Sequence, residues 1–151
     1  MDKVLKEVLE NISPTKEEKK HTENVLSTFV KKLQKLKIPE TTIVPGGSAS
    51  KDTWLAGGHD ADIFFAFKYS TYKDKNQKLS DILELQLKKH ARNCKRLHGS
   101  RDYFQVIEEG FVFEIVPILK ISKASQALNI TDVSILHTKW VLKNSTKKLR
   151  D

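Results

Sequence analysis

The segment Asp60 to Phe67 constrains the fold more than any other part of this 151-residue chain. It reads DADIFFAF, an apolar run that begins with two aspartates one residue apart. Side chains alternate between the two faces of a strand, so a strand here places Asp60 and Asp62 on the same face. The residues that then pack behind the sheet are Ala61, Ile63 and Phe65. The sequence predicts a sheet with one apolar face and two carboxylates on the other.

A third carboxylate interrupts a second predicted strand, Phe111 to Pro117. A strand from Tyr103 to Glu108 precedes it, and Glu109-Gly110 between the two predicts a hairpin turn. Glu114 shares a face of its strand with valines, and a buried, unpaired carboxylate needs a partner or a metal. If this strand lies beside Asp60 to Phe67, three carboxylates meet and repel one another unless cations lie between them.

Mg²⁺ is the cation that such a site favours, because it takes hard oxygen ligands and is typically held by a few carboxylates and substrate phosphates. Two such ions about 3.5–4 Å apart can activate an attacking hydroxyl and stabilise a leaving phosphate. The pattern predicts Asp60, Asp62 and Glu114 as catalytic residues and as ligands of two Mg²⁺ ions. The alternative is that the two aspartates belong to a surface turn.

A glycine turn precedes the aspartates. The β-branched strand 41–44 is followed by Pro45-Gly46-Gly47-Ser48, and residues 49 to 56 could begin a short helix. Glycine lets the backbone approach a phosphate, and a serine at a helix start can donate to its oxygens. Gly47 and Ser48 are therefore predicted to bind a nucleotide, with an ordinary helix cap as the alternative. Lys51 and His137 could balance triphosphate charge, although each alone is more often a surface residue.

Helical spacing of apolar residues fills most of the remaining chain. The first helix ends near Ser13-Pro14, and the second starts there with Ser13 as its cap and continues to Leu36. Two later helices are predicted, over residues 79–97 and 131–140. The predicted fold is one α+β domain with a mixed or antiparallel sheet flanked by helices. Residues 1–143 form this domain, and residues 144–151 are a basic C-terminal tail.

Basic residues dominate the composition. The chain has 27 Lys and Arg against 19 Asp and Glu, a formal net charge of +8, which favours polyanionic partners. The end of the predicted helix 79–97 holds no acid, and its cations could either complement the helix C-terminus or contact an RNA backbone. The residues in question are Lys88, Arg92, Lys95 and Arg96.

Three further features bear on the cellular setting. A single cysteine, Cys94, suggests a reducing environment. No apolar run reaches the roughly 18 residues of a membrane span, and the N-terminus lacks the apolar stretch of a signal peptide. We therefore expect a cytoplasmic protein with no membrane partner.

The segment Gly47 to Leu55, then Gly57 and Asp60 to Phe64, resembles the catalytic signature of the nucleotidyltransferase superfamily related to polymerase beta. More narrowly, it is similar to that of the archaeal CCA-adding enzymes, the tRNA nucleotidyltransferases. Phe113 to Pro117 resembles the strand of the third carboxylate, and Asp132 to Trp140 the segment after it. The similarity covers roughly residues 3 to 143.

The resemblance implies a palm-like sheet with two Mg²⁺ ions on the three carboxylates. It implies that Gly47 and Ser48 grip a nucleoside triphosphate, CTP or ATP, and that His137 contacts the triphosphate. The 3′ hydroxyl of tRNA or another RNA would attack the α-phosphate, and pyrophosphate would leave. A lysine, Lys51, stands where the family usually has an arginine, and Val133 stands where it has another. The family's enzymes continue for several more domains.

Three functions follow from these observations. The first is an RNA nucleotidyltransferase, most simply one acting on the tRNA 3′ end by full or partial CCA addition. The second is a minimal nucleotidyltransferase that modifies a protein. The third is a nucleotide- or RNA-binding module that needs a second subunit, with a homo-oligomer as a further arrangement of the same chain.

Overall fold

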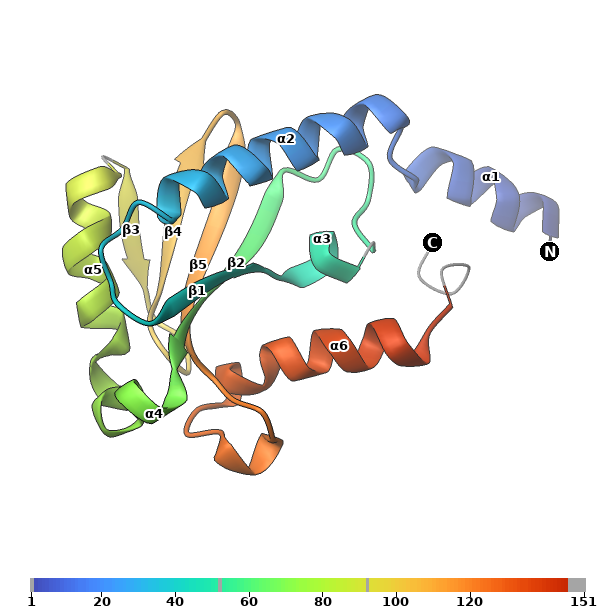
Figure 1. The fold of residues 1–151 in the computed structure, drawn as a ribbon. Helices are drawn as coiled ribbons and strands as arrows, with labels where there is room; N and C mark the ends of the chain where they lie inside the picture. Colours follow the sequence, from blue (N-terminus) through green and yellow to red (C-terminus); the bar gives the residue numbers. More distant parts are fainter. Residues whose placement is uncertain (1, 52, 92, 147–151) are drawn as a thin grey trace.

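A five-stranded mixed sheet forms the centre of the molecule in this computed structural model, which describes residues 2–51, 53–91 and 93–146 (Figure 1). The strand order is β1-β2-β5-β4-β3, with β2 and β5 parallel and the other neighbours antiparallel. The strands are β1 (Thr41–Pro45), β2 (Asp60–Lys68), β3 (Cys94–Leu97), β4 (Tyr103–Glu108) and β5 (Phe111–Lys120).

Helices connect and flank these strands. The α-helices are α1 (Asp2–Ile12), α2 (Lys16–Leu33), α3 (Gly47–Lys51), α4 (Tyr69–Tyr72), α5 (Leu79–His90) and α6 (Ser134–Asn144). The described residues also form 3-10 segments at Lys73–Lys78, Ala124–Gln126 and Ile130–Val133. The predicted α+β class with a mixed sheet is confirmed.

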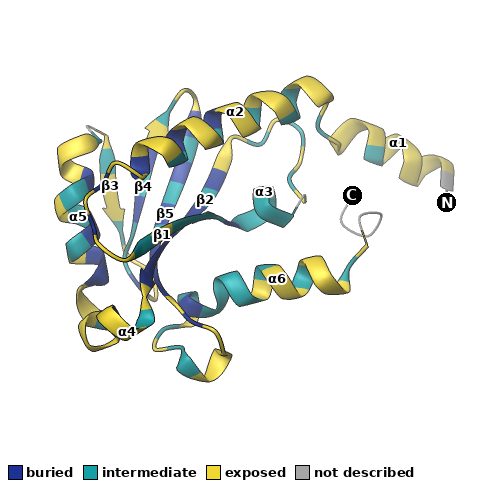
Figure 2. Cartoon of the chain, in the orientation of Figure 1, coloured by how far each residue is buried: buried dark blue, intermediate teal, exposed yellow. Residues whose placement is uncertain are grey.

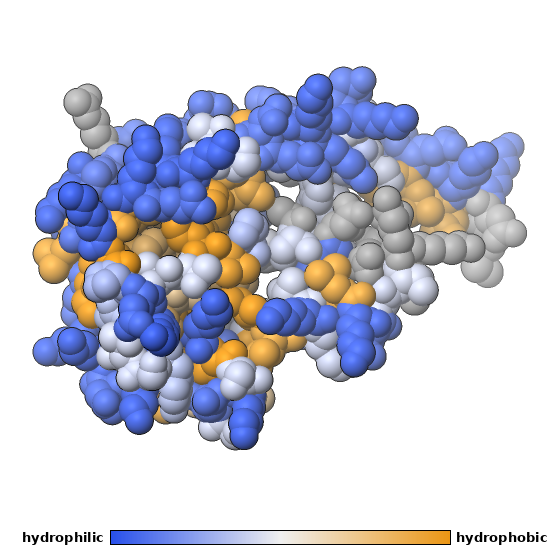
Figure 3. Space-filling model, in the orientation of Figure 1, coloured by the Kyte–Doolittle hydropathy of each residue, from blue (hydrophilic) through white to orange (hydrophobic). Residues whose placement is uncertain are grey.

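Helices α2 and α5 cover one face of the sheet and bury the core there (Figure 2). The ring of Phe29 from α2 stacks on that of Phe113 from β5, with centroids 3.8 Å apart and an interplanar angle of 8°. Leu83 and Leu87 of α5 are fully buried in the same cluster. The outer surface of α2 is hydrophilic (Figure 3). The opposite face of the sheet is left for other contacts.

The hairpin between β4 and β5 turns where the sequence predicts. Glu109 and Gly110 both have positive φ, 51° and 79°. That backbone matches the twist of two antiparallel strands, and Glu108 pairs with Phe111 across the turn. The turn sets the register that places Glu114 along β5.

The predicted helix over residues 79–97 is wrong in its second half. Helix α5 ends at His90, Ala91 has extended backbone angles, and Cys94–Leu97 forms strand β3. The apolar spacing fits a helix, but Cys94 and Leu97 instead pair with Val106 and Tyr103 of β4. Long-range strand pairing outweighs the local periodicity here.

Other boundaries shift by a few residues. Thr15, rather than Ser13, caps α2: its hydroxyl accepts from the Glu18 N–H, and the Glu18 carboxylate accepts from the Thr15 N–H. The predicted helix 49–56 is the earlier and shorter α3. The last helix begins at Ser134 and runs through Asn144, past the start predicted for the tail, whose residues 147–151 lie outside the described part. None of the helices that the structure describes is both long and apolar enough to cross a bilayer.

Candidate active site

The parallel pairing of β2 with β5 brings the predicted carboxylates onto one face of the sheet. Asp62 lies opposite Glu114, and Asp60 lies opposite Val112 one step along the same strands. These residues alternate with buried neighbours on the core side, so their side chains point away from α2 and α5. The buried neighbours are Ala61, Ile63, Phe113 and Ile115.

The carboxylates share a face of the sheet, but their side chains are not clustered into a complete set of metal ligands. Within the described ranges, no three His, Cys, Asp or Glu side chains are grouped closely enough to hold a metal ion. The Glu114 carboxylate instead accepts a hydrogen bond of 3.5 Å from the Gln105 amide of β4. The donor set still fits Mg²⁺, because it consists of hard carboxylate oxygens on neighbouring strands.

Asp62 is the most perturbed acid of this group. Burial raises the pKa of its carboxyl, the negative charge of Asp60 raises it further, and Lys51 of α3 lowers it. The charge of Asp60 therefore opposes the ionisation of Asp62, and a cation between the two carboxylates would relieve the repulsion. This charge repulsion is the second reason that the site fits a divalent metal ion.

The turn between β1 and α3 lies directly against Asp62. The Gly46 N–H donates to the Asp62 carbonyl at 2.8 Å. Gly47 has a φ of +61°, and a Cβ built on it would lie 1.8 Å from the Asp62 Oδ2. Only glycine fits this left-handed position and this close approach. The Gly-Gly pair thus holds the start of α3 over the carboxylates.

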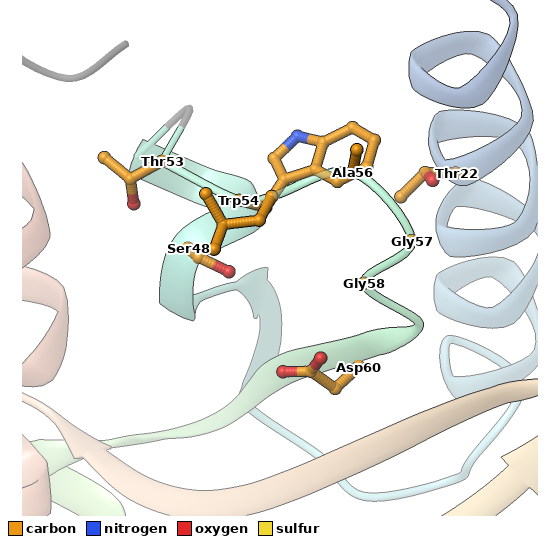
Figure 4. A pocket seen from close by; sticks show the side chains of 9 residues that line it. Thr22, Ser48, Thr53, Trp54, Ala56, Gly57, Gly58 and Asp60 are labelled. Atoms are coloured by element: carbon orange, nitrogen blue, oxygen red, sulfur yellow. The ribbon is translucent and has the colours of Figure 1, made fainter. Parts of the chain in front are cut away.

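A cavity of about 460 Å³ lies beside this turn (Figure 4). Ser48 of α3 and Asp60 of β2 face it from one side, and Trp54 and Thr22 border it on the other (Figure 4). A hydrogen bond connects the loop that carries Trp54 to the end of α1: the Ala56 N–H donates to the Ile12 carbonyl at 2.8 Å. The cavity therefore combines a helix start, a hydroxyl, a carboxylate and an aromatic ring.

Two further predicted contacts are placed differently. Lys51 ends α3, close enough for its charge to act on Asp62. His137 is exposed on α6, which packs against α3, but it does not line the cavity. Of the predicted nucleotide contacts, Ser48 lines the cavity, whereas Gly47 and Lys51 lie on the same short helix outside its lining.

Of the four predicted RNA contacts, three lie in the described part of the chain, on two different elements. Lys88 pairs with Glu84 on α5. Arg96 binds three carboxylates, those of Asp81, Glu84 and Asp102, which hold the pKa of the guanidinium well above its usual range. Lys95 is exposed on β3, and Arg92 lies outside the described residues. Helix α5 keeps a basic last turn, but Lys95 and Arg96 belong to β3 rather than to this helix.

Sequence reasoning missed a buried ion pair between the turn before β4 and the 3-10 segment before α6. The Arg101 Nη1 donates to the Asp132 Oδ1 at 2.6 Å, and the two side chains are 6% and 0% exposed. Asp132 also accepts from the N–H groups of Leu119, Leu128 and Asn129. It joins the end of β5 to the turn that starts α6. No local pattern marks Arg101, and Gln105 and Trp54 were likewise not predicted.

Comparisons with known proteins agree with this geometry. Residues 25–123 match the family described as "Nucleotidyltransferase domain". The CCA-adding enzyme of Nanoarchaeum equitans is 41% identical over 135 residues, which cover 89% of this chain and 33% of that enzyme. The CCA-adding enzyme of Pyrococcus abyssi is 32% identical over 143 residues, 93% of this chain and 32% of that enzyme. The chain spans about a third of the length of these curated relatives.

Solved structures share the fold. A Cid1 poly(U) polymerase superposes with a TM-score of 0.63 at 18% identity, covering 93% of this chain and 41% of that one. A cytoplasmic RNA terminal U-transferase gives 0.60 at 17% identity, covering 93% and 38%. At these identities the likeness concerns the fold alone. Taken with the sequence match, it shows that the chain belongs to the nucleotidyltransferase domain family and is homologous to the archaeal CCA-adding enzymes.

Proposed function

We propose that this chain transfers a nucleoside monophosphate from CTP or ATP to the 3′ hydroxyl of an RNA, the 3′ end of tRNA, with release of pyrophosphate. One observation carries the proposal: Asp60, Asp62 and Glu114 lie on the face of two paired strands that α2 and α5 do not cover, beside a cavity that begins at Ser48. The curated relatives, named CCA-adding enzymes, support RNA as the acceptor. We also propose residues 1–143 as the catalytic domain and 144–151 as its basic tail.

Each part of the site has a distinct task in this reaction. The N–H groups at the start of the Gly47–Lys51 segment, the Ser48 hydroxyl and the Lys51 ammonium bind the triphosphate and orient its α-phosphorus. Trp54 and Thr22 bound the cavity on the side away from the carboxylates. The RNA 3′ oxygen bonds to the α-phosphorus, the bond from that phosphorus to the bridging oxygen of the β-phosphate breaks, and the hydroxyl proton passes to water.

Asp60, Asp62 and Glu114 would hold Mg²⁺ in this reaction. When bound, the metal lowers the pKa of the attacking hydroxyl and neutralises charge that develops on the leaving pyrophosphate. The chain contributes the ligands and their spacing. The Gln105 side-chain amide donates a hydrogen bond to the Glu114 carboxylate and holds it in place.

The direct test is incorporation of labelled CTP and ATP into tRNA transcripts that end before CCA, in the presence of Mg²⁺. The wild type should label the RNA, and Asp62→Ala should not, while circular dichroism shows both folded. Glu23→Ala removes an exposed acid of α2 that does not line the cavity beside Ser48; it is the control and should keep the activity. Labelling by Asp62→Ala at the wild-type rate would contradict the proposal.

A different result would favour one of the other functions. Labelling of a protein in preference to RNA would assign a protein acceptor. Binding of triphosphate without transfer would assign a binding module. If a second polypeptide then restored the transfer, that polypeptide would be the partner that completes the active site.

A further inference from the structure

Strand β1 lies at one edge of the sheet, and its outer side has no strand partner among the described residues (Figure 1). Hydrogen bonds at its two ends fix which backbone groups face β2. The Gly46 N–H donates to the Asp62 carbonyl at 2.8 Å, and the Lys68 N–H donates to the Glu40 carbonyl at 3.0 Å. In an antiparallel pair, positions bonded in this way alternate with positions that are not bonded.

The alternation assigns a direction to every backbone group inside β1. Thr42 and Val44 occupy bonded positions, so their backbone groups face β2. The backbone groups of Thr41, Ile43 and Pro45 therefore point outward, away from the sheet. The N–H groups of Thr41 and Ile43 have no acceptor in the described part of the chain, and Pro45 has a carbonyl but no N–H. An edge of this kind is a template for a further strand.

An apolar groove runs beside this edge, between β1 and α2. One part of about 350 Å³ lies along α2, where Leu26 and Val30 line it together with Pro45. A second part of about 240 Å³ lies nearer the start of β1 and is lined by Leu33 and Ile43, among others. Apolar surface is visible below α2, in the region of β1 (Figure 3). The edge strand is thus flanked by apolar side chains that the core does not fully cover.

The side of α2 that lines the groove carries opposite charges at its two ends. Glu23, Leu26, Val30 and Lys31 all line the groove, and their spacing places them on one face of the helix. Glu23 and Lys31 form no hydrogen bond or ion pair within the described ranges. The chain reverses direction between α2 and β1, so the helix and the strand run antiparallel (Figure 1). The groove is therefore acidic towards one end and basic towards the other.

The β1 edge of a second copy of this chain complements the outward backbone groups. When two β1 strands pair antiparallel about Ile43, each Ile43 N–H donates to the Ile43 carbonyl of the other copy. Each Thr41 N–H then donates to the Pro45 carbonyl of the other copy. The absent N–H of Pro45 removes only one hydrogen bond for each chain. The edge is therefore compatible with its own copy over its whole length.

The charges on α2 favour the same arrangement. A two-fold axis that makes the two β1 strands antiparallel makes the two α2 helices antiparallel as well, because each helix keeps its direction relative to its strand. The Glu23 end of one helix then lies towards the Lys31 end of the other. An unrelated segment of uniform charge would be repelled at one end of the groove, by Glu23 or by Lys31. The order of the charges selects a second copy as the occupant.

We propose that the edge of β1 and the groove side of α2 form the interface of a homodimer, in which two five-stranded sheets join into one continuous sheet. Leu26 and Val30 of each copy are covered by the α2 helix of the other. The carboxylates lie on the face opposite α2, so both candidate active sites open on the same side of the joined sheet. The inference does not depend on the proposed transferase activity.

Sedimentation velocity of the full chain at increasing concentrations tests the interface. The mass of the wild type should rise from 17.3 kDa towards twice that value. Ile43→Pro removes the outward N–H at the centre of the strand pair without removing a bond to β2, since proline is tolerated where the N–H faces away from the sheet. This variant should stay monomeric, and its thermal unfolding checks that it is folded. A wild type that stays at 17.3 kDa at every concentration would overturn the inference.

Charge reversal on α2 provides a second readout that leaves the core intact. Lys31→Glu should raise the dissociation constant of the dimer at least about tenfold, because like charges that face each other across an interface are strongly unfavourable. Adding Glu23→Lys to this variant restores opposite charges in the reverse order and should recover most of the affinity. Lys89→Glu makes the same charge change at an exposed position of α5 outside the groove, and it should leave the dissociation constant unchanged.

The outcomes separate this interface from other occupants and from the proposed function. A dimer that persists in both Ile43→Pro and Lys31→Glu would have its interface elsewhere, and the inference would be wrong. A monomeric wild type whose groove binds a synthetic peptide of alternating valine and glutamate would assign the edge to a peptide partner instead. If the variants dissociate as expected but the wild type transfers no nucleotide, the interface stands and the transferase proposal fails.

Discussion

Asp62 is the residue at which stability and function oppose each other. Burial and the charge of Asp60 raise the pKa of its carboxyl in the folded protein. The unfolded chain therefore ionises this group first as the pH rises, and the folded state loses stability between the unfolded and the folded pKa values. At neutral pH the ionised Asp62 destabilises the fold, and protonation at low pH removes that cost.

Asp62→Asn should consequently be more stable than the wild type at neutral pH, with a Tm higher by a few degrees, and inactive in transfer. The advantage should shrink as the pH falls, because the wild-type carboxyl then becomes protonated. Differential scanning calorimetry from pH 3.5 to 7.5 measures it. A variant whose Tm difference is the same at every pH would show that the repulsion between Asp60 and Asp62 does not operate.

Alanine substitutions at Gly47 and Gly57 separate two contributions to lost stability. One is the cost of a positive φ in a residue with a Cβ, and the other is the cost of a steric clash of that Cβ. Both have positive φ, 61° and 74°, but a Cβ on Gly57 meets no atom within 4 Å, whereas on Gly47 it collides with the Asp62 carboxylate. Gly57→Ala should cost about 1–2 kcal/mol of stability, the cost of a left-handed alanine. Gly47→Ala should cost more.

Gly47→Ala should also lower the transfer rate by roughly 10²-fold, since a displacement of about 1 Å at a reacting group has that effect. Urea unfolding and transfer kinetics on both variants provide the comparison. Equal losses in the two variants would mean that the approach of Gly47 to Asp62 has no role.

Among the elements, the connection from β5 to α6 depends on a single buried pair. Arg101 precedes β4, and its guanidinium donates to Asp132 and to the Pro117 carbonyl. Arg101→Met should lower the free energy of unfolding by about 3–5 kcal/mol, because it leaves the Asp132 carboxylate buried without its cation. Urea denaturation measures this loss.

The double variant Arg101→Met with Asp132→Leu should lose less than the sum of the two single variants, since it removes both charges. It should not recover fully, because three backbone N–H groups lose their acceptor. Strict additivity would show that the two side chains act independently. α6 carries His137, so the same variants should also report whether the position of α6 affects nucleotide binding.

Predictability from sequence differs between elements. β2, β5 and the hairpin turn follow from alternation and turn chemistry, which act over a few residues and are visible in the sequence. β3 was assigned to a helix because Cys94 and Leu97 also fit helical spacing, and what decides their structure is β4, a partner that no local window contains. For the same reason the ion pairs of Arg96, which join α5, β3 and the turn after it, could not be foreseen.

At the scale of the whole molecule, the sequence indicates which residues are candidates for the site. It does not indicate which of these residues face each other across the sheet. The two-residue period of strands placed Asp60 and Asp62 together, and an isolated acid in an apolar strand marked Glu114. That Glu114 faces Asp62, rather than Asp60, depends on the register of two strands far apart in the sequence. The hydrogen bond from Gln105 to Glu114 depends on a further register, that of β4 with β5, which only the folded sheet defines.

The parallel pairing of β2 with β5 also has a consequence for synthesis on the ribosome. β1 and β2 are neighbours in sequence and can associate early, but the strand that completes the carboxylate face is the last of the five to be made. Non-local pairing of this kind is slow, because the intervening chain must be ordered first. The nascent chain therefore cannot present three acids to a metal until β5 has emerged, and its long apolar β2 needs protection until then.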